Sequence, residues 1–546
     1  MDLPGNYCIV TVRDPLVEIN LFLDSCRCCT YYHQMIYITE FLVYLVVLLL
    51  IGLYSMKKQT LGNEGFIIGG RTLGPLTTAV SAGASDMSSW LLLGLPGAVF
   101  ASGLVEGIWI SLGLTIGAYF NWLIVAKRLR LMSAKYSAIT LPSFISKRFD
   151  DPKGILRLIA NLVILFFFTL YVASGFKGGT LLFAHTFGAT EKLSLLVTAA
   201  VVISYTFLGG YLAVCLTDLL QGLLMLTALV FCAVLGYVAI SGTGVDISAI
   251  RPAAFSISTG WITAASLMAW GFGYFGQPHI LARFIGIKDT DSVPKARRIG
   301  IVWMIICLVM AISIGLVGIG YDAVHGLPGV GGEGGNPERV FLALTTALFH
   351  PAFAGFVLAA VLAAVMSTAD SQLLVLTSSL TEDVPGIKDL DSKKKMIISR
   401  AGVVGFALLA VLIAATDKGN ILSMVGYAWG GFGAAFGPLM ILSLCWKRTT
   451  WWGALSGIVT GAATIFIVKN FISIPGEYFY ELMPGFIVSF IVVVVVSLLT
   501  KKPSAEALAV YDETRGVWHI ATLDGRLLAF NQAWGGPGFA AVTHRW

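Results

Sequence analysis

Charged residues are scarce in this chain. Only 12% of its 546 residues are Asp, Glu, Lys or Arg, whereas 57% are hydrophobic and the mean hydropathy is +0.84. In soluble proteins, charged residues alone make up about a quarter of the chain. The composition therefore excludes an ordinary soluble protein and predicts an all-α polytopic membrane protein.

Metal-binding and processing signals are also lacking. Cys26, Cys28 and Cys29 crowd the N-terminal region, but no cysteine or histidine stands at metal-ligand spacing from them, which argues against a metal site. Four other cysteines fall in or beside apolar segments, where cysteine usually acts as a small hydrophobe. The first 30 residues have no continuous apolar core, so we expect no cleavable signal peptide of the usual shape.

Apolar segments follow one another along most of the chain. Each is long enough to cross a hydrocarbon layer of about 30 Å as a helix. We predict thirteen membrane helices at approximately 35–55, 75–101, 106–126, 155–183, 191–212, 214–241, 259–279, 299–321, 353–380, 400–416, 421–445, 450–470 and 482–500.

Positive charges are distributed unevenly between the connecting segments. With thirteen helices the two termini lie on opposite sides of the membrane. If the N-terminus is outside, the inner segments hold 27 of the 36 Lys and Arg residues and the outer segments hold seven. Cytoplasmic loops carry the excess of Lys and Arg, so the sequence predicts an outer N-terminus and a cytoplasmic C-terminus.

We interpret residues 35–503 as one membrane domain. Residues 1–34 lack a periodic pattern and form an N-terminal extension, while 504–546 form a polar cytoplasmic tail, expected as a small hairpin or as disorder. Residues 381–399 are expected to form a solvated inner loop facing anionic lipid. The glycine-rich residues 326–336 are expected to form a flexible external connection.

Asp86 lies near the middle of the second predicted span, which has no other charge. Placing a carboxylate in lipid costs about 3 kcal/mol on the insertion scale, so an acid at this depth is expected to face a polar cavity or an ion. Small residues surround it, and Gly83 and Gly94 weaken the helix on either side. We therefore predict a helix break near Asp86 that frees carbonyls for a cation; the alternative is a packing helix whose acid pairs with a neighbour.

The seventh predicted span is rich in glycine and aromatic residues. Trp270 and Tyr274 stand four residues apart, which places them on one face if the segment is an α-helix. Such a pair can wall a small apolar ring while the phenol supplies a polar group. We favour a binding site here over the alternative of core or lipid packing.

The ninth span carries Ser367 and Thr368, followed by Asp370. The two adjacent hydroxyl groups supply neutral oxygens of the kind that coordinate alkali cations. The alternative is that both hydroxyls bond to a carbonyl one turn earlier in their own helix. Asp218 is expected to open the sixth helix, where it either meets the helix dipole or takes part in coupling. Lys177 is expected to extend toward the outer interface.

Several motifs together carry a family resemblance. In chain order they are Gly69-Gly70-Arg71-Thr72-Leu73-Gly74, Ser85-Asp86-Met87-Ser88, Leu95-Pro96-Gly97-Ala98, Tyr205-Thr206-Phe207-Leu208-Gly209-Gly210-Tyr211, Gly276-Gln277-Pro278-His279-Ile280-Leu281-Ala282-Arg283-Phe284 and Met366-Ser367-Thr368. With these motifs in this order, the chain from about Met35 to Pro503 resembles the sodium/solute symporter family, and within it the members that carry proline.

The resemblance implies a leucine-transporter-type core, built from ten helices in two inverted five-helix repeats. It places sodium between the first and the eighth core helix. It implies that Asp86 matches the family's sodium-sensitive aspartate. The implied sodium ligands are the carbonyl oxygens of Ala84, Met87 and Ala364 and the hydroxyls of Ser367 and Thr368.

The resemblance also implies a proline site. The matching positions are Tyr171, Trp270 and Tyr274, with Ser88 and Trp90 nearby. Ser89 stands where the proline symporters usually have glycine. Its added hydroxymethyl group is expected either to narrow the site or to add a hydrogen bond.

The implied function is sodium-coupled uptake of L-proline across a bacterial cytoplasmic (inner) membrane, without enzyme activity. Sodium is the coupling ion; we expect no cofactor, nucleic acid or protein partner, and the lipid bilayer as the surroundings. The alternative is another small solute of the family, such as pantothenate, a sugar or a short acid. A membrane sensor is disfavoured because the tail is shorter than a signalling domain of about 100 residues.

Overall fold

The computed structural model describes residues 27–58, 63–206, 210–384, 386–387 and 389–515. Within these ranges the protein is helical and has no β-strand; Leu73 and Ile287 form an isolated bridge. The described residues contain ten helical segments that are long and apolar enough to cross a membrane. They comprise α2 (Arg27–Lys58), α6 (Leu104–Phe120) continued by η3 (Asn121–Ala126) and α7 (Lys127–Lys135), α9 (Ile155–Phe187), α11 (Tyr211–Ser241), α15 (Ser292–His325), α17 (Pro351–Asp383), α18 (Ser392–Thr416), α19 (Ile421–Cys445), α20 (Trp451–Phe471) and α21 (Leu482–Leu499).

The other three predicted spans are shorter or interrupted helices. The second span divides into α4 (Pro75–Asp86), the π-helix η2 (Trp90–Gly94) and α5 (Leu95–Ser102). The fifth is α10 (Glu191–Thr206). The seventh divides into α13 (Trp261–Met268) and the 3₁₀-helix η5 (Ala269–Gly276), and α14 (Pro278–Gly286) begins at its proline. The count of thirteen membrane helices therefore stays a prediction.

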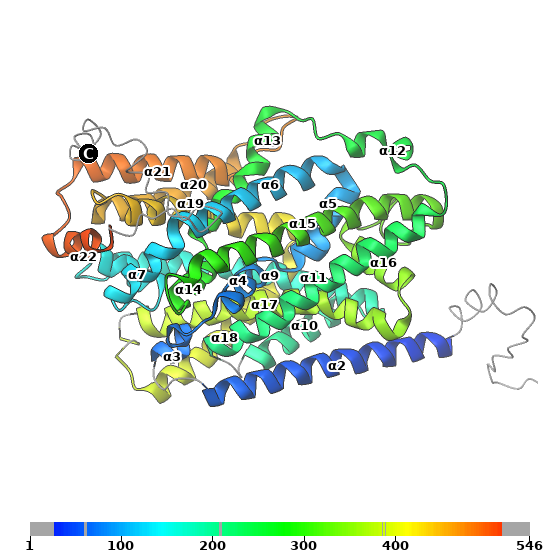
Figure 1. Cartoon of the computed structure of the whole chain (residues 1–546), viewed down its shortest axis with the longest axis horizontal. Helices are drawn as coiled ribbons and strands as arrows, with labels where there is room; N and C mark the ends of the chain where they lie inside the picture. The colour runs from blue at the N-terminus through cyan, green and yellow to red at the C-terminus, as the bar shows by residue number, and fades with distance from the viewer. Residues whose placement is uncertain (1–26, 59–62, 207–209, 385, 388, 516–546) are drawn as a thin grey trace, which may run out of the picture.

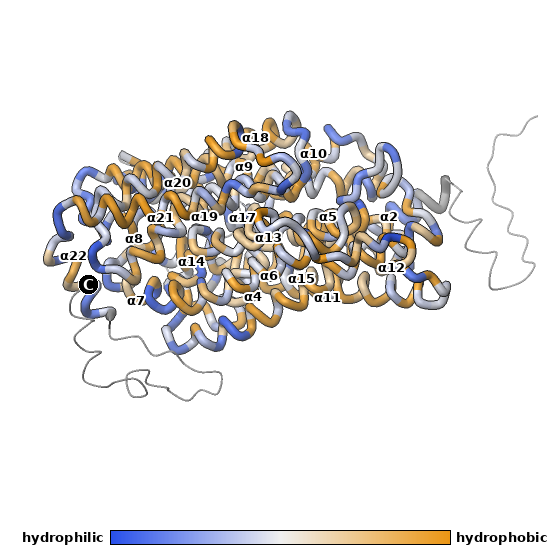
Figure 2. Tube along the Cα trace, turned by 90° about the horizontal axis from the view of Figure 1, so that it is seen from above, coloured by the Kyte–Doolittle hydropathy of each residue, from blue (hydrophilic) through white to orange (hydrophobic). Residues whose placement is uncertain are grey.

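Short helices complete the fold at its two ends. They are α3 (Asn63–Ile68), η1 (Gly69–Arg71), α8 (Leu141–Arg148), α12 (Ile247–Ile250), η4 (Pro252–Phe255), η6 (Pro337–Arg339), α16 (Val340–Leu348) and α22 (Ala505–Arg515). Figure 1 shows the long helices running along the longest axis of the molecule, with α7 and α22 at one end and α12, α16 and the start of α2 at the other. Polar residues gather toward these two ends (Figure 2).

Two predicted boundaries need correction. Most of the expected inner loop 381–399 is helical, because α17 continues to Asp383 and α18 begins at Ser392. Helix α2 begins at Arg27, so it takes up the last eight residues of the expected extension 1–34. The described part of the tail is the helix α22. The hairpin or disorder expected for the tail stays a prediction, because residues 516–546, like 1–26, lie outside the described ranges.

The core is densest around α17 and α19. Nearly every residue of α17 from Val357 to Leu374 is buried. Helix α6 approaches η5 so closely that a Cβ added at Gly117 would lie 2.1 Å from the carbonyl oxygen of Gly271. Only glycine fits at such a contact, and this contact fixes the position of the segment that carries Trp270 and Tyr274.

Candidate binding site at the broken helix

The α-helical hydrogen bonding of α4 ends at Asp86. Met87 has φ −81° and ψ 78°, outside the helical region, and the amide of Ser88 donates to the carbonyl oxygen of Asp86 at 3.0 Å. The chain then resumes as the π-helix η2. The break predicted from the sequence near Asp86 is therefore confirmed.

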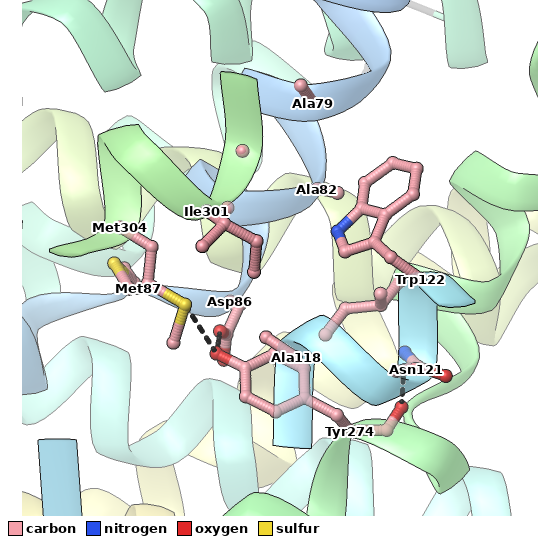
Figure 3. Close-up of a pocket in the computed structure, with 13 residues that line it drawn as sticks. Ala79, Ala82, Asp86, Met87, Ala118, Asn121, Trp122, Tyr274, Ile301 and Met304 are labelled. Atoms are coloured by element: carbon pink, nitrogen blue, oxygen red, sulfur yellow. Dashed lines mark hydrogen bonds between the residues drawn. The ribbon is translucent and has the colours of Figure 1, made fainter. Parts of the chain in front are cut away.

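Asp86 connects three of the residues expected to bind the solute. Its carbonyl oxygen accepts from the Tyr171 hydroxyl at 3.1 Å and from Trp90 Nε1 at 3.0 Å. Its carboxylate accepts from the Tyr274 hydroxyl, and Figure 3 shows these two side chains pointing toward each other. All four side chains are at most 5% exposed, so the network is closed off from the surface.

A cavity adjoins this contact. Asp86, Met87, Asn121, Tyr274 and Met304 are among its lining residues, which come from α4, η3, η5 and α15 and lie around it in Figure 3. Most of the other lining side chains are small or apolar. A cavity with an apolar wall and one carboxylate suits a small solute that has both an apolar part and a charged group.

Tyr274 lines this cavity and Trp270 does not, and the two side chains do not share an α-helical face. Four residues turn an α-helix by about 400°, which returns nearly to the same side, whereas in the 3₁₀-helix η5 they turn it by about 480°. The two rings therefore point in different directions. Trp270 stacks on Tyr480 at 5.2 Å between ring centroids, while Tyr274 meets Trp429 edge-on at 5.0 Å.

Side chains of neighbouring helices satisfy carbonyl groups of η5. Trp429 Nε1 donates to the carbonyl oxygen of Trp270 at 2.7 Å, and Asn121 Nδ2 donates to that of Tyr274 at 2.9 Å. Gln277 Nε2 reaches the carbonyl oxygen of Gly273 at 3.2 Å. These bonds compensate for α-helical bonds that η5 does not make, and they hold the irregular backbone beside a cavity instead of lipid.

The residues expected to bind sodium lie where α4 meets α17. Ser367 Oγ is 2.8 Å from the carbonyl oxygen of Ala84 and 3.2 Å from that of Ala364. Thr368 Oγ1 is buried and has no hydrogen-bond partner among the described residues, so the expected alternative of bonding to its own helix is wrong for Thr368. Met87 is fully buried at the break. Neutral oxygens of this kind suit a hard monovalent cation.

Known proteins resemble this chain over most of its length. The model of the family described as "Sodium:solute symporter family" matches residues 66–461. The osmoregulated proline transporter OpuE of Bacillus subtilis (strain 168) is 45% identical over 471 residues, 85% of this chain and 94% of that protein. The sodium/proline symporter of Staphylococcus aureus (strain JH9) is 45% identical over 480 residues, 85% of this chain and 92% of that protein.

This chain belongs to the sodium:solute symporter family. It is a multi-pass membrane transporter and not an enzyme. A sodium-coupled sialic acid symporter in a substrate-bound, outward-open state superposes with a TM-score of 0.72 at 19% identity, covering 86% of this chain and 99% of the other. Mhp1, a nucleobase-cation-symport-1 family transporter in a closed conformation, gives 0.54 at 15% identity, covering 82% and 98%.

The two structural neighbours show the leucine-transporter-type fold that the sequence predicts. The division of this symporter into two inverted five-helix repeats stays a prediction.

The expectation that Asp218 opens a helix is wrong. Helix α11 begins at Tyr211, so Asp218 lies two turns inside it. Its Oδ2 is 2.9 Å from Arg283 Nη2, and both side chains are fully buried. Ser81 Oγ donates to the same carboxylate at 2.6 Å, and Arg283 also reaches Ser371 on α17. The charge pair thus joins α4, α11, α14 and α17 just beyond the break.

Two functional candidates were missed by sequence reasoning. Arg283 lies in one of the family motifs, but the sequence analysis predicted no function for it. An arginine in an apolar segment indicates a buried carboxylate partner, and this signal could have identified it. Trp429 carries no such signal, because it reaches the site only through the packing of α19 on η5. Lys177 lies near the loop before α19, where its Nζ donates to the carbonyl oxygen of Asp417 at 3.1 Å.

The serines at the break have separate surroundings. Ser88 Oγ accepts from the amide of Trp90 at 3.5 Å, a weak bond within the turn. Ser89 packs on α9, where a Cβ added at Gly178 would lie 2.3 Å from the Ser89 Cβ. The Ser89 hydroxyl has no hydrogen-bond partner among the described residues. The hydroxymethyl group therefore occupies the space that Gly178 leaves open.

Proposed function

We propose that this protein imports L-proline together with sodium. The observation that carries the proposal is the 45% identity, over 85% of the chain, to two bacterial proteins named as proline transporters. The site agrees with it: a small amphipathic solute would find aromatic rings, the Tyr274 hydroxyl and the carboxylate of Asp86 around one cavity.

We place sodium between α4 and α17, at the carbonyls of Ala84, Met87 and Ala364 and the hydroxyls of Ser367 and Thr368. The distances from Ser367 to two of these carbonyls support the assignment. A cation at this position would tie the broken helix to α17. Because the same break carries Asp86, sodium would favour the arrangement that binds the solute, and the solute would raise sodium affinity by the same factor.

We place proline against Tyr171, Trp270 and Tyr274, with Ser88 and Trp90 at the break. The hydroxyl of Tyr171 and Nε1 of Trp90 donate to the carbonyl oxygen of Asp86, and the ring of Trp90 lies 6.4 Å from that of Trp270. Asp86 and Asp218 are proposed to couple the two ligands. The first touches the aromatic site and the second pairs with Arg283 across four helices.

We place the protein in the cytoplasmic membrane of a bacterium, with the N-terminus outside and the C-terminus inside. The excess of Lys and Arg in alternate loops supports this orientation. One positive charge moving inward at about 150 mV supplies about 3.5 kcal/mol, and a tenfold sodium gradient adds about 1.4 kcal/mol. Together they suffice for an accumulation of several thousandfold.

Uptake of labelled solutes into proteoliposomes tests the proposal. Labelled L-proline should accumulate with an inward sodium gradient and should not accumulate when potassium replaces sodium on both sides. Labelled pantothenate, the alternative solute, serves in a parallel assay. Accumulation of pantothenate without proline would overturn the proposed substrate but leave the sodium site standing.

A further inference from the structure

A second cavity lies beyond the sodium residues. Its walls come from α3, α11, α14 and α17 and from the start of α8. Ser378 on α17 lines it and stands ten residues past Thr368, which is about 15 Å along an α-helix. This direction leads toward the end of the molecule that carries α7, α8 and α22 (Figure 2). A solute or ion leaving the site toward that end would pass this cavity.

The cavity wall carries hydroxyl groups without partners. Ser378 Oγ, Ser379 Oγ and Tyr211 Oη are buried and have no hydrogen-bond partner among the described residues. Buried polar atoms in proteins are almost always hydrogen-bonded. This wall is therefore suited to water or to a polar passenger, unlike the apolar packing of the surrounding helices.

The start of α8 closes one side of this cavity. Ile139, Thr140 and Leu141 line it, and the helix that follows is almost wholly buried, with Phe144 and Ile145 at 0% exposure. A capping box fixes where α8 begins, because the Thr140 hydroxyl accepts from the amide of Ser143 at 3.1 Å. We refer to residues 139–148 as the α8 lid.

One carboxylate holds the α8 lid against α17. Thr140 Oγ1 donates to Asp383 Oδ1 at 3.0 Å, and Arg157 Nε at the start of α9 lies 3.3 Å from the same oxygen. Asp383 is 0% exposed although it ends its helix. The Thr140 hydroxyl thus accepts the capping hydrogen bond of α8 and donates its only hydrogen bond to Asp383.

We propose that the α8 lid closes the inner exit of the transport pathway and that Asp383 is the positioning residue that keeps it closed. Opening the lid requires that Thr140 leave Asp383. Arg157 stays beside the carboxylate, so the carboxylate is not left without a charged partner when the lid moves away. The inference rests on the proposed transport function and orientation, but its test needs neither solute nor sodium.

The experiment measures access to the cavity. In a cysteine-free version, Ser379→Cys supplies one thiol in the cavity wall, and its reaction rate with an impermeant maleimide is measured in inverted membrane vesicles and in intact cells. Asp383→Ala and Thr140→Val should each react at least tenfold faster than the parent in inverted vesicles. Thr140→Ser restores the hydroxyl and should react like the parent.

Glu382→Gln is the matched control. It breaks the neighbouring ion pair with Lys395, 3.0 Å long, which joins α17 to α18, and it keeps Thr140, Asp383 and Arg157 unchanged. Its reaction rate should equal the parent's. The proposal that α8 acts as a lid would be wrong if all variants reacted at the parent's rate on both membrane faces. It would also be wrong if Glu382→Gln accelerated the reaction as much as Asp383→Ala does. Acceleration from the outer face alone would refute the inner exit. Failure of the parent protein to take up proline in the separate proteoliposome assay, together with the expected labelling pattern, would count only against the proposed substrate.

Discussion

At the scale of single residues, the site depends on side chains whose hydrogen bonds cross between helices. Ser367 reaches Ala84 on another helix, and Tyr274 reaches Asp86. Thr368, by contrast, keeps a buried hydroxyl without a partner. Leaving such a hydroxyl unpaired costs about 1–3 kcal/mol, which supports a ligand for that oxygen.

Thr368→Val tests the sodium assignment. The change keeps the shape of the side chain and removes only the oxygen, so we expect the sodium concentration for half-maximal proline uptake to rise at least tenfold, about 1.4 kcal/mol. Proline affinity at low sodium should fall correspondingly. Thr377→Val is the control, because its hydroxyl bonds to the carbonyl of Leu373 in its own helix. If the sodium dependence of proline uptake by Thr368→Val superimposes on that of the parent, Thr368 is not a sodium ligand.

Tyr274→Phe tests the solute assignment. The variant loses the hydrogen bond to the Asp86 carboxylate, and hydrogen bonds to charged groups contribute about 1.5–3 kcal/mol. We expect half-saturation by proline to rise at least tenfold in initial-rate uptake. Tyr427→Phe, whose ring packs on Phe167 away from Asp86, should leave it unchanged. Normal half-saturation in Tyr274→Phe would show that this hydroxyl serves packing alone.

At the scale of elements, the broken and irregular helices are held in place by close backbone contacts and by caps. Helix α6 touches η5 at glycines, and the loop before α16 touches the start of α19. These contacts fix the position of backbone segments, and those segments hold the side chains proposed to bind the ligands. Substitutions there should alter ligand affinity without removing a ligand contact.

Gly117→Ala tests the contact between α6 and η5. The added methyl would lie 2.1 Å from the carbonyl oxygen of Gly271, so η5 must shift, and with it Trp270 and Tyr274. We expect proline affinity to fall at least tenfold while the sodium dependence in the absence of proline changes little. Gly405→Ala on α18 has open space around it and should gain up to about 1 kcal/mol of stability. Unchanged proline affinity in Gly117→Ala would show that η5 tolerates displacement.

We expect Glu338, in the loop before α16, to make the stability of the protein depend on pH. Its Oε1 accepts from the amide of Ile421 at 2.7 Å, at the start of α19. Burial raises the pKa of Glu338 to about 7, opposed by the amides of Ile421 and Leu422 and by Lys177. Because the folded pKa lies above the unfolded value, stability from this group is fully present below about pH 4.5 and is lost as pH rises through about 7.

Glu338→Gln keeps an oxygen acceptor but cannot ionise. The apparent melting temperature of the parent in detergent should therefore fall more between pH 5 and pH 8 than that of the variant. Glu333→Gln changes an exposed glutamate of the same loop and should retain the parent's pH profile. Identical profiles for the parent and Glu338→Gln would contradict the buried, titrating carboxylate.

At the scale of the whole molecule, the described chain starts and ends at opposite ends of the long axis (Figure 1). This agrees with an odd number of membrane crossings. It does not choose between the two orientations, which only the charge asymmetry addresses.

Cysteine accessibility tests the orientation. In a cysteine-free version, single cysteines in residues 149–153 should resist an impermeant thiol reagent in intact cells, because the inner segments hold most of the positive charge. A cysteine at Gly332, whose surroundings are open, should react. The reverse labelling pattern would show that the protein has the opposite orientation in the membrane. Inverted vesicles, in which the reactive and protected positions exchange, provide the control.

The sequence by itself determined the membrane class, the approximate helix positions, the break at Asp86 and the family. These features follow from local properties: apolar length, an acid among small residues, and motifs in a fixed order. Hydropathy along one segment is enough to show that it avoids water. The same local information showed that the hydroxyls of Ser367 and Thr368 lie in an apolar span, while their role as sodium ligands stays a prediction.

Only the tertiary structure decided which of those groups meet. The pairing of Asp218 with Arg283 joins residues 65 positions apart, and the contact of Ser367 with Ala84 joins residues 283 apart. The 3₁₀ geometry of η5 depends on donors from η3 and α19 and on the close contact with α6, so the spacing of Trp270 and Tyr274 alone gave the wrong face. Contacts between distant segments arise from how helices pack, and their energies depend on neighbours that a single segment does not encode.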